Sequence, residues 1–295
     1  MRRTLHILPL PLAATAHAAT LNQRLPPCVL ALRRLGRSEQ SLQRAAASAR
    51  ELLLGRTVAY RDLERELERR HPRLPGIARV TIKWLWERGE IVYLDLSPSL
   101  HHERRAFALT REAYPDLDLR AHSCSVAQEE LVLTHIRAFG PVSPLDTAWW
   151  SGMGTGRVRR ALERRARELV RVRVSGLGGD LVAHQADVDA LRAADPIDPD
   201  ELALLSYEDP SLKGYFDTRG RYVSSEGYRV LFNSIGEARA SIVRGGKVVG
   251  IWTWNRGARR VEQQLFKKLP RRLQRCLDER LDDMERFLRA EPVLV

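Results

Sequence analysis

Residues 79–96, RVTIKWLWERGEIVYLDL, pass from a helical hydrophobic pattern into the alternating pattern of a half-buried strand. Two helical segments, 38–55 and 57–72, precede this stretch, and a second strand follows at 106–112 after a polar turn. The order helix, helix, helix, strand, turn, strand predicts a winged helix. The third helix of such a unit can enter a DNA major groove, although winged helices also serve as protein-docking modules.

The same order of elements recurs about eighty residues later. Ser125 and Gln128 have the spacing of a capping box at a helix start. The predicted elements are helices at 125–140, from Ser143 and Pro144, and at 154–169, followed by strands at 169–176 and 181–184. These elements predict a second winged helix.

The last third of the chain has a different pattern. A hairpin is predicted at 239–255 with Gly245 and Gly246 at its tip, then a strand at 261–269 and an amphipathic helix from Pro270. We therefore expect an α+β fold of tandem winged helices with a C-terminal β-containing region and a closing helix. The expected domains are a remnant of an N-terminal winged-helix region at 1–37, winged helices at 38–120 and 121–192, and the C-terminal region at 193–295.

The charge balance points to a polyanion. Lys and Arg number 49 against 37 Asp and Glu, which gives a net charge of +12. Arginine forks suit phosphate oxygens, although an arginine-rich composition alone explains part of this excess. The residues predicted to contact DNA are Arg79, Lys83, Arg157, Arg159, Arg160, Arg164, Arg244 and Lys247, and the first wing adds His101, His102, Arg104 and Arg105.

The start of the chain has features of a secretory signal. Arg2 and Arg3 precede an apolar run and the small-x-small site Ala16-His17-Ala18, but Pro9 and Pro11 interrupt the run. The three cysteines have no metal-site spacing and are typical of a reducing compartment. We expect a cytoplasmic protein without a membrane span, metal or cofactor.

Several stretches together resemble the winged-helix family that contains the AlkZ and YcaQ (AlkX) DNA glycosylases. They are RTLHILP at 3–9, FGPVSPLDTAWWSGM at 139–153, and LLSYEDPSLKGYFDTRGRYV at 204–223 followed by GGKVVGIWTW at 245–254. In the family, a segment like RTLHILP lies inside the protein. The resemblance therefore implies that Met1 is an internal methionine, or the start of a shortened paralogue, and it disfavours the secretory signal.

The resemblance also implies which chemistry to look for. Family members that cleave alkylated bases carry a Gln-x-Gln or Gln-x-Asp motif upstream of the Thr-Leu-His segment, and no such motif precedes it here. Gln40 and Gln43 have the wrong spacing, and Gln263 and Gln264 are adjacent. We therefore identify no catalytic residue.

Some residues of the family-like blocks still invite a role at DNA. His6 is a candidate for a lesion pocket or for a structural group, and Trp149 and Trp150 are candidates for base stacking or for core packing. We expect the carboxylates Asp146, Asp209 and Asp217 to cap helices or form salt bridges.

These observations predict a monomeric winged-helix DNA-binding protein that binds damaged double-stranded DNA. The relatives implied by the resemblance excise alkylated bases or unhook interstrand crosslinks, whereas this chain lacks the main catalytic motif. A full-length product, if one exists, would be a monofunctional, metal-independent glycosylase. A winged-helix transcription regulator, a non-catalytic DNA-binding paralogue and a protein-docking module stay open as alternatives.

Overall fold

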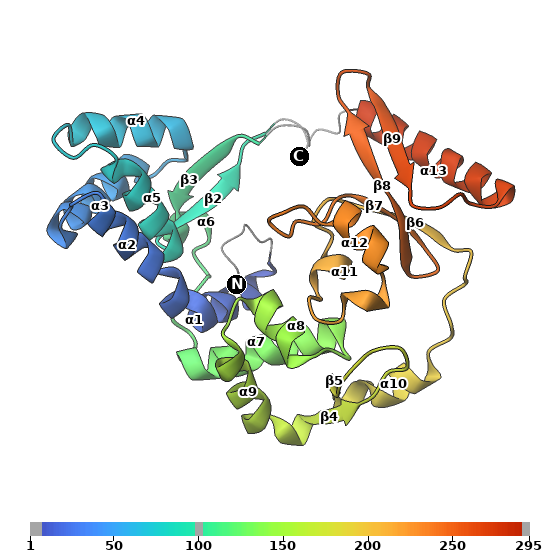
Figure 1. Cartoon of the computed structure of the whole chain (residues 1–295). Coiled ribbons are helices and arrows are strands. Elements are labelled where there is room, and N and C mark those ends of the chain that lie inside the picture. Colours follow the sequence, from blue (N-terminus) through green and yellow to red (C-terminus); the bar gives the residue numbers. More distant parts are fainter. Residues whose placement is uncertain (1–7, 98–102, 291–295) are drawn as a thin grey trace. The chain divides into compact units, whose positions relative to one another are not determined.

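Helix α7 (Cys124–Phe139) contains the boundary between two units of the chain. The computed structural model describes residues 8–97 and 103–290. One unit ends at Leu131 and the other begins at Val132. Figure 1 labels the elements of both units.

The first unit begins with α1 (Leu10–Arg24) and α2 (Pro26–Arg34). Pro11 does not prevent α1, because it lies in the first turn, where no backbone donor is needed. Ala16 and Ala19 of α1 are buried. Residues 10–24 therefore pack as a helix of a folded unit.

The first predicted winged helix is present. Its elements are α3 (Glu39–Leu53), β1 (Val58–Ala59), α4 (Tyr60–Arg70), α5 (Ile77–Glu87), β2 (Ile91–Asp95), β3 (Arg105–Leu109) and α6 (Thr110–Ala113). The strands form an antiparallel sheet in the order β1-β3-β2. Two boundaries differ from the sequence prediction: Val58 and Ala59 pair with β3 instead of opening a helix, and the strand predicted at 106–112 ends at Leu109, where α6 begins.

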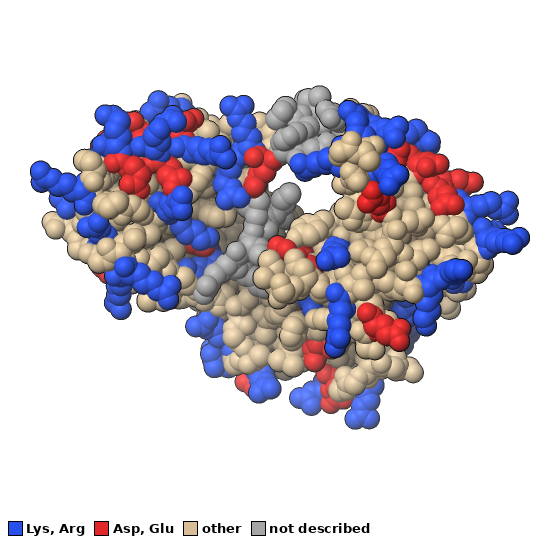
Figure 2. Space-filling view, turned by 45° about the horizontal axis from the view of Figure 1, so that its top comes forward, with Lys and Arg blue, Asp and Glu red and all other residues tan. Residues whose placement is uncertain are grey.

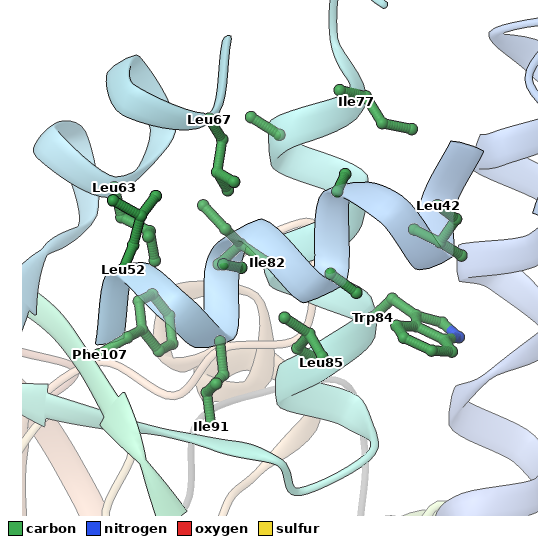
Figure 3. Close-up of a cluster of buried hydrophobic side chains, with 14 of the residues drawn as sticks. Leu42, Leu52, Leu63, Leu67, Ile77, Ile82, Trp84, Leu85, Ile91 and Phe107 are labelled. Carbon is green, nitrogen blue, oxygen red and sulfur yellow. The ribbon is translucent and has the colours of Figure 1, made fainter. Parts of the chain in front are cut away.

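The core of this unit lies where α3, α4 and α5 meet the sheet. Figure 3 shows Leu63 and Leu67 of α4, Leu85 of α5 and Phe107 of β3 converging there. Ala45, Ala46 and Ala49 of α3 have no exposed surface, and their small side chains let α5 approach closely.

The second winged helix has a reduced sheet. Its elements are α7, α8 (Pro144–Ser151), α9 (Thr155–Arg164), η1 (Ala166–Glu168), β4 (Leu169–Val172) and β5 (Leu181–His184), followed by η2 (Gln185–Asp187) and α10 (Val188–Ala193). The first strand of a winged helix is represented only by Val142, which exchanges two backbone hydrogen bonds with Val182 of β5.

The helix starts in this region are only partly as predicted. Ser143 and Asp146 form a complete capping box at α8. The capping box predicted for Ser125 and Gln128 is wrong, because α7 begins at Cys124 and Ser125 lies inside it. The Ser123 hydroxyl instead accepts the Val126 N–H at 3.4 Å.

The C-terminal part is a four-stranded antiparallel sheet in the order β6-β7-β8-β9. Its elements are β6 (Leu202–Leu205), α11 (Pro210–Lys213), η3 (Arg219–Arg221), α12 (Ser225–Leu231), β7 (Ser241–Arg244), β8 (Lys247–Asn255), β9 (Arg260–Leu265) and α13 (Arg271–Arg289). Leu277 and Leu281 of α13 pack with Ile242 on one face. Leu212 and Leu231 pack with Ile251 in a separate cluster. Helices therefore cover both faces of the sheet.

Candidate nucleic-acid interface

Helix α5 places its two predicted DNA contacts on its exposed side but pairs both with acids. The Arg79 guanidinium lies 2.5 Å from Glu64, and the Lys83 ammonium lies 2.6 Å from Glu87. Seven of the eleven residues of α5 are buried. Little of the helix, and little of its net charge, is therefore available to a DNA groove.

A second helix also packs along α5. Cys28 and Ala31 of α2 line a pocket of about 230 Å³ together with Arg79, Lys83 and Glu87. Burial opposes ionisation of Glu87, but hydrogen bonds from Lys83 and Arg24 outweigh it and lower the pKa of the carboxyl. This ion cluster ties α1 to α5, so Lys83 has a structural partner.

Helix α9, unlike α5, is mostly exposed to solvent. Only Val158 and Ala161 of its ten residues are buried. Arg159, Arg160 and Arg164 are exposed and Arg157 is half-buried. Within the described ranges, Arg159 and Arg160 form no ion pair with a carboxylate. This helix presents positive charge to solvent in a way that α5 does not.

The wing of the second winged helix extends the same surface. Arg159 and Arg171 of β4 line a groove of about 480 Å³, together with Leu162 and Asp180. Asp180 also lies 3.2 Å from Arg173, which is 88% exposed at its side chain. The groove therefore combines an apolar floor with two guanidinium groups, whose charge Glu163 and Asp180 of the same lining balance.

The predicted contacts on the hairpin β7–β8 are anchored to the protein. Arg244 lies 2.8 Å from Asp200 and donates to the carbonyl of Pro199 at 3.1 Å. Lys247 donates to the carbonyl of Arg221. Both side chains hold the tip of the hairpin against the protein, and Asp200 offsets the charge of Arg244.

A second hairpin has a basic tip that sequence reasoning missed. Residues 256–259, between β8 and β9, form an exposed turn that contains Arg256 and Arg259. Arg259 donates to the carbonyl of Arg289 at 3.0 Å. The signal was present in the sequence as RGAR between the two segments predicted as strands, the second half of the hairpin at 239–255 and the strand at 261–269.

The paired tryptophans have different environments. Trp150 packs on His135, with ring centroids 4.8 Å apart, and contributes to the interior of the unit. Trp149 stacks on Phe216 at 5.8 Å with an angle of 17° between the rings. Phe216 is 48% exposed. Of the two tryptophans, Trp149 is the one beside an accessible aromatic surface.

Two of the family-like carboxylates cap helices, as predicted. Asp209 accepts the Ser211 N–H at 2.9 Å at the start of α11. Asp146 closes the α8 capping box and also accepts the backbone N–H groups of residues 216–218. Burial opposes ionisation of Asp146, but these bonds prevail and lower its pKa. Asp146 is buried and both of its oxygens accept hydrogen bonds, so it is not free to position a water.

One tripeptide elsewhere in the sequence has the family's Gln-x-Asp pattern. Gln185-Ala186-Asp187 reads as Gln-x-Asp, but it follows the Thr-Leu-His segment instead of preceding it. It forms the 3-10 turn η2 at the end of the wing, where the Ala186 N–H donates to His184. Its place in the fold is that of a turn. His6, His101 and His102 lie outside the described residues.

Comparison with known proteins decides the family. The family described as DNA glycosylase AlkZ-like matches residues 1–287. The chain belongs to the AlkZ-like DNA glycosylase family. Its structure is similar to that of the Streptomyces sahachiroi DNA glycosylase AlkZ, with a TM-score of 0.71 and 20% sequence identity over 92% of this chain and 73% of that one.

A comparison with curated proteins found no match. The AlkZ-like family and fold confirm the expected α+β architecture and a DNA-glycosylase-like, DNA-binding protein. Within the part of the chain that the structure describes, no helix is both long and apolar enough to cross a membrane.

Proposed function

We propose that this AlkZ-like protein binds damaged double-stranded DNA as a monomer in the cytoplasm, mainly through α9 and the wing of its second winged helix. The observation that carries this proposal is the exposure of Arg159 and Arg160 on a helix that buries only two of its ten residues. Guanidinium groups without acidic partners can exchange their counterions for DNA phosphates.

Other predicted contacts have smaller roles in this proposal. Arg79 and Lys83 already pair with Glu64 and Glu87, so binding DNA there would require breaking those pairs. Arg157 and Arg164 share α9 with the two principal arginines. Arg244 and Lys247 support the tip of the hairpin, and Arg256 adds charge at the tip of the next hairpin.

We propose no catalytic role for the family-like carboxylates of this chain. Excision of an alkylated base requires a water placed at the sugar C1′ and stabilisation of positive charge that develops there. Both oxygens of Asp146 accept hydrogen bonds within the protein, and Asp209 caps α11 through one oxygen. We expect the 295-residue chain to bind methylated DNA without releasing 7-methylguanine.

Equilibrium binding to labelled duplexes at low salt tests this function. We expect similar affinity for several unrelated sequences and tighter binding to a methylated duplex. A transcription regulator would instead prefer one sequence, by roughly a thousandfold or more, and a protein-docking module would bind no duplex. Sedimentation of the complex should show one chain per DNA.

A further inference from the structure

The ring pair of Trp149 and Phe216 presents an aromatic face to solvent. The rings are 5.8 Å apart and close to parallel, so each supports the other. Phe216 is 48% exposed although phenylalanine is among the residues most often buried. Although Trp149 and Arg219 both lie against this ring, about half of the side chain remains exposed, which is enough surface for a second flat ring to stack on.

The loop that carries Phe216 is held rigidly from beneath. The backbone N–H groups of Phe216 and Asp217 donate to Asp146 at 2.7 and 2.8 Å, and the Thr218 hydroxyl donates to the same carboxylate at 2.7 Å. Asp146 has no exposed surface. An exposed aromatic side chain on a fixed backbone is organised in advance for binding, because little freedom is lost when a ligand stacks on it.

A buried cation lies behind the same ring pair. Arg219 is 3% exposed, and its Cζ lies 4.6 Å from the ring centroid of Trp149 and 5.3 Å from that of Phe216. Its hydrogen bonds go to neutral groups, the Tyr215 carbonyl and the Tyr228 hydroxyl, and its second terminal nitrogen has no partner in the described residues. The ring faces of Phe232 at 4.0 Å and Tyr228 at 5.7 Å also stabilise the cation, but no carboxylate of the described residues forms an ion pair with it, as is usual for a buried arginine.

We propose that the exposed face of Phe216 binds an unpaired, uncharged nucleobase of DNA, with the field of Arg219 favouring the adjoining phosphate. This inference rests on the proposed DNA binding and names a second contact, separate from α9. Any of the four bases can stack on an aromatic ring. The phosphate beside it supplies the negative partner that Arg219 does not have among the described residues. A nucleotide therefore satisfies both features.

The positive charge of Arg219 also determines which kind of base can stack on Phe216. An N-alkylated purine is cationic, and Arg219 together with Lys213, whose ammonium lies 4.9 Å from the Trp149 ring, would repel it. Lys213 is paired with Glu208 at 2.9 Å, so the unneutralised charge belongs to Arg219. We therefore assign this face to an undamaged base displaced from the stack.

Binding of bulged duplexes by the full chain tests this inference. Three labelled duplexes are compared: fully paired, with one bulged thymine, and with a bulged abasic analogue. The wild type should bind the thymine bulge more tightly than the abasic bulge by about 5- to 150-fold, the range measured for one stacked base. F216A should abolish this difference, and F216W should retain it.

A matched control is available on helix α13. Phe287 is 51% exposed, close to the 48% of Phe216, so F287A removes an equally exposed ring and should retain the preference for the thymine bulge. Unchanged affinity of F216A for the paired duplex shows that this variant is folded. An equal preference for the thymine bulge in F216A and the wild type, or an equal loss in F287A, would overturn the inference.

The outcomes separate this inference from the proposed function. If the wild type binds no paired duplex at low salt but still prefers the thymine bulge through Phe216, the proposed role of α9 fails and the base contact stands. If the paired duplex binds and Phe216 has no effect on the bulge, only the base contact fails.

Discussion

Asp146 shows how much a single side chain can organise in this fold. Its carboxylate joins the start of α8 to residues 216–218, some seventy positions later in the chain. The aspartate and the helix start were predictable from the SPLD sequence, residues 143–146. The hydrogen bonds from residues 216–218 were not predictable, because no local sequence pattern indicates a hydrogen bond between residues so far apart in the chain.

Asp146→Asn should destabilise the second unit by about 3 kcal/mol, since hydrogen bonds to a charged acceptor are lost and an amide N–H2 group faces buried donors. Urea unfolding of the full chain measures the change. Asp209→Asn is the matched control, because asparagine caps a helix as well as aspartate does. A change below about 1 kcal/mol for Asp146→Asn would contradict the structural role assigned to its charge.

His135 links the stability of the second unit to pH. The ring has no exposed surface; its Nε2 donates to the Gly214 carbonyl at 2.8 Å, and its Nδ1 lies 2.9 Å from the Thr147 hydroxyl. Because the carbonyl can only accept, the neutral ring carries its proton on Nε2. Burial lowers the pKa of His135 from 6.5 to about 4.

This shift predicts stability that is lost in mild acid. The unfolded chain takes up a proton below pH 6.5, whereas the folded chain resists protonation down to about pH 4. The contribution of His135 is therefore present above pH 6.5 and falls by about 3 kcal/mol as pH drops to 4, at about 1.4 kcal/mol for each pKa unit. Urea unfolding across this range should show a shallower loss in His135→Gln. An equally steep loss would exclude His135 as the source.

At the scale of elements, the two winged helices have the same order of parts but differ in their third helix. Helix α5 buries seven of eleven residues, whereas α9 buries two of ten. Both were predicted from their patterns, and both were expected to contact DNA. The sequence could not show that Glu64, fifteen residues before Arg79, neutralises it, because that pairing depends on how α4 packs against α5.

Removing the α5 charges should therefore matter less than removing those of α9. We expect Arg79→Ala with Lys83→Ala to weaken duplex binding by less than about threefold, because a screened and already paired charge releases few counterions. The corresponding α9 double variant should weaken it more strongly at the same salt concentration. Equal losses in the two double variants would show that both third helices contact DNA.

An element was predictable where its buried residues recur with a regular spacing in the sequence. Leu42, Ala45, Ala49 and Leu53 recur at helical spacing, and α3 is the helix that this spacing predicts. The first strand of the second winged helix left no such pattern, because it consists of Val142 alone. The exposure of the Phe216 ring could not be predicted from the sequence either, because Asp146, from another part of the chain, holds its backbone in place.

At the scale of the whole molecule, the net charge of +12 is informative only once its pairing is known. In Figure 2, blue and red side chains intermix over α4, where Arg65, Arg69 and Arg70 pair with Asp62, Glu51 and Glu66. The AlkZ-like family indicates that DNA is the partner of this charge, and the exposed side chains of Arg159 and Arg160 on α9 indicate where it binds. We therefore propose that Arg159 and Arg160 anchor duplex DNA.

The salt dependence of duplex binding is the decisive measurement for these two arginines. The logarithm of the binding constant should fall linearly with the logarithm of salt concentration, and Arg159→Ala with Arg160→Ala should reduce the slope by about 1.8, at about 0.9 for each phosphate contact. Arg275→Ala with Arg280→Ala removes the same charge from the exposed side of α13 and should leave the slope unchanged. An unchanged slope in the α9 variant, or equal reductions in both variants, would show that Arg159 and Arg160 do not contact DNA phosphates specifically.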